Sequence, residues 1–168
     1  KNMIFFRNKK ILNSNEQTTI KDIRKKTLFN LEKFNMNIED EVLKGEKVLV
    51  ISNYDLPQND KLFFENSFFD LKNENFVAKD IEIQLKKNTF DNMNNDPRLK
   101  GVSLTKKNDV TTINKGIFTS CKKNDDCPPW AISAKKITHD KNKKLLIYED
   151  ALLKVYNIPI LYFPKFFH

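Results

Sequence analysis

Hydrophobic and polar positions alternate along most of this chain, and a period of two is typical of half-buried β-strands. Ile81, Ile83 and Leu85 form one such alternating run. From Trp130 onward every second residue is again apolar, and the apolar face resumes at Ile137 after a slip in parity. The segment that follows continues one apolar face through Leu145, Ile147, Ala151, Leu153 and Val155. The pattern therefore predicts a series of antiparallel hairpins with little or no helix.

Turn signals recur along the chain about every 8 to 12 residues, as in all-β proteins. Residues 18–29 offer the best helical spacing, but we favour two strands joined by a charged turn at Asp22 to Lys26, because the neighbouring segments are strands. Only three glycines are present, so tight Asn-Gly turns are missing. We therefore expect longer turns built on Asn, Asp and Lys, and an irregular loop from Asn88 to Arg98.

The hairpins resemble degenerate copies of one unit. Residues 31–50 align with residues 64–83 at an offset of 33, which places Gly45 on Ala78 and Val48 on Ile81. The segment after Ser133 repeats the pattern, and residues 99–120 fit it more loosely. A repeat of paired strands predicts a solenoid or a stacked open jelly roll.

Composition fits one soluble domain over residues 1–168, with 31% charged residues and a net charge of +8. The lysines are spread along the chain, which disfavours nucleic-acid binding and leaves a solvated surface or an anionic lipid partner. No apolar run approaches the roughly 20 residues that a membrane-spanning helix needs. We find no catalytic motif, and His139-Asp140 fits turn chemistry better than catalysis, so we expect no enzyme and no cofactor.

Cys121 and Cys127 lie six positions apart and leave more than one interpretation. A redox pair would need C-x-x-C spacing, and a zinc site would need more ligands than His139 and His168 provide. We therefore expect no metal and favour a disulfide, either between these two cysteines or with others outside the sequence.

The stretch from residue 115 to the end also carries a family resemblance. It contains FTSC, then PPW, AKKITHD, a basic turn, IYEDALLKV and IPILYFPKFFH. In this order these motifs resemble the end of the periplasmic domain of the OstA-like family, to which the LPS-assembly protein LptD belongs. In that family they precede a transmembrane β-barrel, so the chain is expected to be an excised part that stops before its barrel.

The resemblance implies a fold and a function. The family domain is an open V-shaped β-jelly roll that shields the acyl chains of LPS on the periplasmic face of the outer membrane of Gram-negative bacteria. Expected partners are LPS, an LptA-like periplasmic bridge protein at the N-terminal edge near residues 1–12, the chain's own C-terminal barrel beyond residues 156–168, and an LptE-like lipoprotein. Pro159 and Pro164 would interrupt strand pairing at that junction. Cys121 matches a family cysteine that can pair with the barrel, whereas a second cysteine as near as Cys127 departs from the family pattern.

The chain contains 14 phenylalanines, which fit either an ordinary core or an apolar groove, and only the resemblance favours the groove. The residues expected to line that groove are Phe34, Met36, Ile38, Val48, Val50, Phe64, Phe69, Ile81, Ile83, Leu85, Ile132, Ile137, Leu145, Ile147 and Leu153. The alternative is a structural or adhesive β-solenoid with a filled core. A polysaccharide-processing β-helix enzyme is disfavoured, because no carboxylate constellation is evident.

Overall fold

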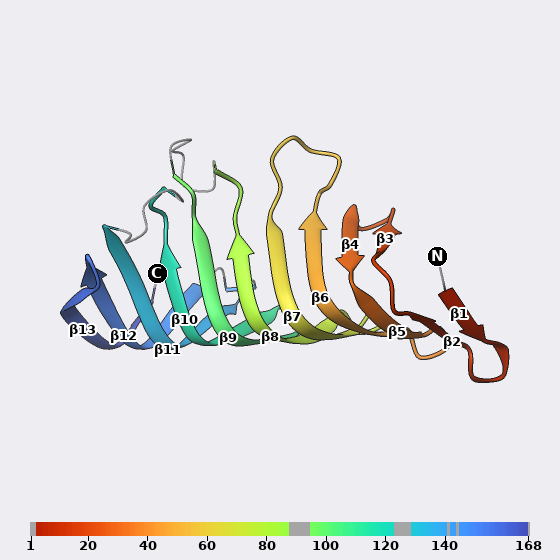
Figure 1. Cartoon of the computed structure of the whole chain (residues 1–168). Helices are drawn as coiled ribbons and strands as arrows, with labels where there is room; N and C mark the ends of the chain where they lie inside the picture. The colour runs from red at the N-terminus through yellow and green to blue at the C-terminus, as the bar shows by residue number, and fades with distance from the viewer. Residues whose placement is uncertain (1–2, 88–94, 123–128, 141, 144, 168) are drawn as a thin grey trace.

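One continuous antiparallel sheet makes up the protein, as a computed structural model of the chain shows (Figure 1). The structure describes residues 3–87, 95–122, 129–140, 142–143 and 145–167. These residues form thirteen strands and one 3₁₀ turn, η1 (Arg7–Lys9), and no α-helix, which confirms the all-β expectation. Within the same residues, no helix is long and apolar enough to cross a membrane.

The strands follow one another as hairpins. Their bounds are β1 Met3–Phe6, β2 Ile11–Ser14, β3 Thr18–Asp22, β4 Thr27–Leu31, β5 Lys33–Asn37, β6 Val42–Ser52, β7 Lys61–Asp70, β8 Asn75–Gln84, β9 Arg98–Lys107, β10 Val110–Thr119, β11 Trp130–Asp140, β12 Leu145–Val155 and β13 Ile158–Phe167. From β5 to β13 each strand pairs with the next one along the chain. The charged turn predicted between residues 22 and 26 is confirmed, because β3 and β4 flank it and pair antiparallel.

A three-residue step interrupts the alternation of inward-facing residues in every strand from β6 to β13. Elsewhere in these strands one outward-facing residue separates successive inward-facing residues, whereas at this step two residues separate them. The inward pairs are Gly45/Val48, Phe64/Ser67, Ala78/Ile81, Gly101/Leu104, Ile113/Gly116, Ala134/Ile137, Tyr148/Ala151 and Phe163/Phe166. Because these pairs lie side by side in the ladder, the steps form one line across the sheet, which we call the corner.

Left-handed backbone conformations mark the corner on alternate strands. Lys47, Asp80, Lys115 and Asp150 have φ between 46° and 50°, and the strand pairing skips each of these residues. An extra residue of this kind bends a strand sharply, as in a β-bulge. The sheet therefore folds into a trough with two arms (Figure 1). The lower arm holds the hairpin turn between β7 and β8, and the upper arm holds the loop between β6 and β7 (Figure 1).

At the N-terminal end the two arms have separate edges. β4 pairs only with residues 49–52 of β6, which belong to the upper arm, and β5 pairs only with residues 42–46, which belong to the lower arm. The upper arm consequently ends at β3 and the lower arm at β1. At the other end, β13 is the edge of both arms.

Small residues allow the two arms to meet at the corner. All three glycines lie there, and none has a positive φ, so they serve close packing and not turns. A Cβ at Gly101 would lie 2.6 Å from Cγ2 of Ile113, and a Cβ at Gly45 would lie 2.7 Å from Leu31 and from Val48. Such distances are too short for carbon atoms, so these positions admit no larger side chain without movement of the core.

The expected repeat is confirmed by the corner. The offset of 33 superposes Gly45/Val48 on Ala78/Ile81, and these are the inward pairs of β6 and β8. The slip in parity noted before Ile137 is the same feature on β11, between Ala134 and Ile137. Residues 99–120 also follow the pattern, since β9 and β10 bend at the same line.

The expectations about turns and prolines are confirmed only in part: the β3–β4, β5–β6 and β7–β8 turns have four residues each, and the β12–β13 register is irregular beside Pro159 and skips Pro164. The β9–β10 and β12–β13 turns contain only two residues each, and Tyr156 and Asn157 both have positive φ, as tight hairpin turns require. Pro159 and Pro164 do not end the pairing but lie within β13. Pro159 sits beside a register shift and Pro164 at the corner, where an edge strand can dispense with an amide N–H.

Replacing Gly101 with alanine tests the packing at the corner. Ile113 Cγ2 is attached directly to its own Cβ and cannot swing away without a rotamer change, so we expect Gly101→Ala to lower the free energy of unfolding by about 1–3 kcal/mol. The control is Val102→Ala at the adjacent exposed position, where the change should stay within about 0.5 kcal/mol. Urea denaturation measures both, and equal midpoints would contradict the role of this glycine.

Candidate functional site

An apolar cavity of about 860 Å³ lies between the two arms in the N-terminal half of the trough. Its upper-arm lining comes from Ile20, Phe29, Val50, Leu62 and Phe64. Its lower-arm lining comes from Met36, Leu43, Phe69, Leu71 and Phe76. These side chains face inward because the three-residue step keeps the apolar face of both arms turned toward the same space.

Aromatic rings connect the arms across this cavity. Phe29 of the upper arm meets Phe69 of the lower arm edge to face, with ring centroids 5.5 Å apart. Phe64 of the upper arm lies 6.3 Å from Phe69 and 5.9 Å from Phe76. Aromatic pairs at these distances are attractive, so the rings hold the arms together while the cavity remains beside them.

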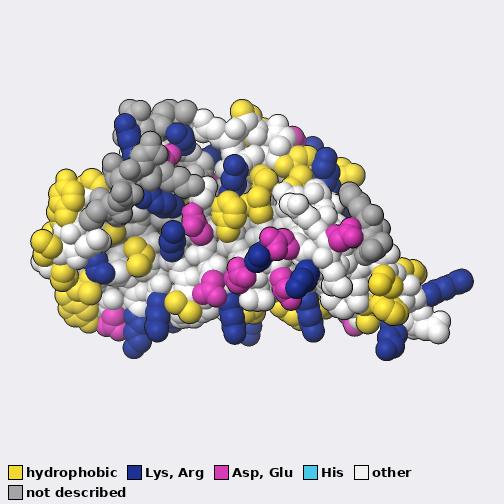
Figure 2. Space-filling view, viewed as in Figure 1, with side chains coloured by type: hydrophobic (Ala, Val, Ile, Leu, Met, Phe, Trp, Pro, Cys, Tyr) yellow, Lys and Arg dark blue, Asp and Glu magenta, His cyan; other side chains and the backbone are white. Residues whose placement is uncertain are grey.

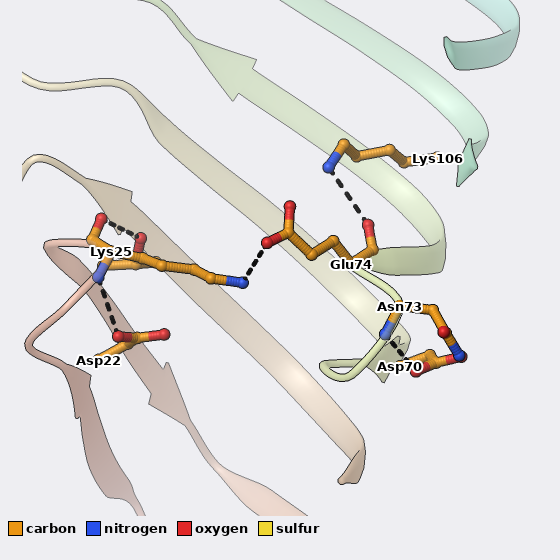
Figure 3. A network of polar contacts seen from close by, with 7 residues as sticks. Asp22, Lys25, Asp70, Asn73, Glu74 and Lys106 are labelled. Carbon is orange, nitrogen blue, oxygen red and sulfur yellow. Dashed lines mark hydrogen bonds and ion pairs between the residues drawn. The ribbon is translucent and has the colours of Figure 1, made fainter. Parts of the chain in front are cut away.

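Charged side chains at the tips of the two arms form the rim of the cavity. The upper rim comprises Lys21 and Asp22 at the end of β3 with Arg24 and Lys25 of the following turn. The lower rim comprises Glu41, Asp70, Glu74 and Lys106 from the turns and strand ends of the lower arm. Lys25 Nζ donates to Glu74 Oε1 at 2.7 Å, and Lys106 Nζ donates to the backbone carbonyl of Glu74 at 3.2 Å (Figure 3). We call the Lys25–Glu74 contact the rim ion pair, since it joins the two arms at the mouth of the cavity.

Each rim turn is stabilised by its own aspartate. The backbone N–H of Lys25 donates to Asp22 Oδ1 at 3.0 Å (Figure 3). The Thr27 hydroxyl donates to the Lys25 carbonyl. On the opposite turn, the side chain and the backbone N–H of Asn73 both donate to Asp70. These hydrogen bonds lower the pKa of Asp70, so their contribution is present above its unfolded pKa and is lost as the pH falls through the lowered value.

The C-terminal half of the trough contains a packed interior. Leu104, Ile113 and Ile137 are buried in adjacent strands. Tyr148 stacks on Phe166 with ring centroids 4.4 Å apart, and its burial raises the pKa of the phenol. These buried residues belong to the same hydrophobic core as Phe64 and Phe69 of the N-terminal half.

The predicted groove residues divide between cavity, core and outer surface. Met36, Val50, Phe64 and Phe69 line the cavity. The other inward-facing candidates belong to the core or pack against it, and these are Phe34, Val48, Ile81, Ile83, Ile132 and Ile137. Leu153 is half-buried and pairs with Ile132 on the inner face.

Four predicted groove residues lie elsewhere. Ile38 is in the turn after β5, and 44% of its surface is exposed. Leu146 and Tyr148 pack inward, so Leu145 and Ile147 point to the outer face. The reason is the corner at Asp150, which shifts the parity of β12 and was not anticipated there. Leu85 lines a separate hollow of about 430 Å³ among the loops.

Sequence reasoning missed several cavity residues. These are Ile20, Phe29, Leu43, Leu62, Leu71, Phe76 and the rim cations Lys21, Arg24, Lys25 and Lys106. A search of the sequence for pairs of polar residues that separate two small or apolar residues would have located the corner. It would thereby have shown which face of each strand most of the apolar cavity residues occupy. The rim contact joins residues 49 positions apart in the sequence, and no local pattern predicts it.

The disulfide expectation has no support in the described part of the chain. Cys121 carries a free thiol there, and Cys127 lies outside the described residues. The Cys121 thiol lies 3.7 Å from the carbonyl oxygen of Trp130. Among the described residues, no group of three or more His, Cys, Asp or Glu side chains could hold a metal ion.

Exposed apolar side chains gather at both ends of the trough (Figure 2). At the N-terminal end all four residues of β1 are exposed. At the other end, β13 exposes Ile158, Ile160, Leu161, Tyr162 and Phe167 by half or more of their surface. Between the ends, lysines and acidic residues are intermixed (Figure 2). Edge strands with apolar residues on both faces are suited to pairing with another chain.

No protein-family model matches the chain, and no curated protein matches its sequence. Membership in the OstA-like family therefore stays a prediction that rests on the motifs of the C-terminal stretch.

Replacing Phe69 with alanine tests whether the rings hold the arms together. Phe69 is 6% exposed and contacts both Phe29 and Phe64, so Phe69→Ala should cost about 3–5 kcal/mol of unfolding free energy. It should also enlarge the cavity and raise the fluorescence of an apolar dye. Phe68→Ala, next in sequence on the exposed outer face, is the control. A similar loss of stability in both variants would refute the arrangement.

Proposed function

We propose that the trough shields the acyl chains of a lipid and acts as a lipid-transport module of outer-membrane LPS assembly. The observation that supports this most directly is the apolar cavity between two arms, bounded by an exposed charged rim. Its volume of about 860 Å³ lies within the range of ligand pockets, roughly 300–1,000 Å³. Each methylene group buried there would contribute about 0.8 kcal/mol.

The charge of the chain fits a phosphorylated lipid. The net charge of the chain is +8, and the rim carries four cationic side chains beside four acidic ones. A lipid placed with its tails in the cavity would have its head group at this rim, where Lys and Arg can bind phosphate oxygens. Moving a lipid from one apolar site to the next needs no bond chemistry, so the protein would act as a carrier and not as an enzyme.

The exposed edges support an arrangement in a longer assembly. β1 is the lower-arm edge at the N-terminal end, and an LptA-like bridge protein would add its own strand there. β13 would face the barrel of the same protein and an LptE-like lipoprotein. The module would thus stand at the periplasmic face of the outer membrane and pass LPS from the bridge to the barrel.

A structural or adhesive β-solenoid is the second candidate. It is favoured by the aromatic contacts between the arms and by the buried residues of the C-terminal half. In that case the cavity would be a packing defect that no ligand enters. The two proposals differ in whether a lipid chain reaches the inner face.

Photo-crosslinking from an inner and an outer position distinguishes them. Phe76 lines the cavity, whereas Ile117 of β10 lies on the outer face with 48% of its surface exposed. With a photoreactive residue at each position in turn and LPS added, the carrier proposal predicts labelling from Phe76 and little from Ile117. Ile147, on the outer face of β12, is a second control.

The outcome decides between the proposals. Absence of lipid labelling at Phe76, or equal labelling at Phe76 and Ile117, would reject the carrier proposal and leave the filled solenoid. Circular dichroism of each variant confirms that the β-sheet has formed.

A further inference from the structure

The rim ion pair joins the tips of the two arms, which the sheet connects only through the corner. Lys25 lies in the turn just beyond the tip of the upper arm, where Thr27 pairs with Ser52, the last residue of β6. Glu74 lies in the turn just beyond the tip of the lower arm, where Asn75 pairs with Asp70, the last residue of β7. Their side chains meet at 2.7 Å across the mouth of the cavity (Figure 3). A lipid head group at this mouth would occupy the same place.

The two turns hold these side chains toward one another. Asp22 fixes the backbone of Lys25, and Asp70 fixes the turn that contains Glu74. Both aspartates are thus engaged within their own turns, so Glu74 is the carboxylate that reaches across the rim. Lys106 donates to the backbone carbonyl of Glu74, and Arg24 lies in the same rim.

The rim ion pair is exposed enough to exchange its partner. The Lys25 and Glu74 side chains are 52% and 60% exposed. Ion pairs in such positions contribute about 0.2–1 kcal/mol, so an anion of similar chemistry can displace the carboxylate. A phosphate monoester carries up to two negative charges and would contact Lys25 together with Lys106.

We propose that the Lys25–Glu74 ion pair is an exchangeable link across the mouth of the cavity, in which the phosphate of a bound anionic amphiphile replaces Glu74 at Lys25. This inference rests on the proposed lipid-binding function and adds the class of head group that the site selects. An uncharged head group does not compete with Glu74 and leaves the ion pair in place. The arms are then held at the mouth by the ion pair in the empty state and by the lipid phosphate in the loaded state.

Two amphiphiles with the same chain test the exchange. Decyl phosphate and decyl maltoside are titrated into the whole chain by calorimetry, below the concentrations at which they form micelles. Glu74→Gln removes the competing charge and should raise the affinity for decyl phosphate about two- to fivefold, the range expected of an exposed ion pair. Lys25→Met should lower that affinity by a similar factor, and both variants should bind decyl maltoside like the wild type.

The pair Lys47–Glu32 provides a matched control. Its side chains meet at 3.0 Å and are 56% and 55% exposed, and neither residue lines the cavity. Glu32→Gln removes one negative charge without touching the rim and should leave both affinities unchanged. If Glu32→Gln strengthens decyl phosphate binding as much as Glu74→Gln does, the effect is one of net charge and the exchange is refuted.

The remaining outcomes separate the two proposals. If the wild type binds both amphiphiles and Glu74→Gln changes neither affinity, or changes both equally, the exchange fails while lipid binding stands. If the wild type binds neither amphiphile, lipid binding itself fails and the exchange fails with it.

Discussion

The three-residue step between inward-facing residues is the constraint on which the whole structure depends. Side chains in a strand alternate between faces, so a strand that passed the corner without the extra residue would turn its apolar face outward beyond it. Neighbouring strands share one hydrogen-bond ladder, and all of them must therefore bend at the same line. The result is one sheet with two arms that enclose a common apolar space.

Packing within that space differs along the trough. In the C-terminal half, Leu104, Ile137 and Tyr148 fill the interior. In the N-terminal half, the rings of Phe29, Phe64 and Phe69 bridge the arms but leave a cavity beside them. Both halves nevertheless share one hydrophobic core, to which Phe64 and Phe69 belong together with Leu104 and Ile137.

Much of the fold could be predicted from the sequence, because the alternation within each strand involves residues that are neighbours in the sequence. The offset of 33 already superposes Gly45 on Ala78, and the parity slip before Ile137 is the corner of β11. The same slip in parity between Tyr148 and Ala151 was not recognised, and Ile147 was therefore assigned to the wrong face. The doublets of polar residues in GEKV, AKDI, AKKI and YEDA would have revealed it. Contacts across the rim could not be predicted, since they depend on how far the arms close.

The central claim is that the inner space admits a lipid chain. Native mass spectrometry of the chain, repurified after incubation with LPS, tests it most directly when wild type and Leu62→Trp are compared. Leu62 lines the cavity, and a tryptophan there would occupy part of its volume. The account predicts a bound lipid mass on the wild type that is reduced or lost in the variant. A wild type that carries no lipid, or a variant that carries as much, would contradict it.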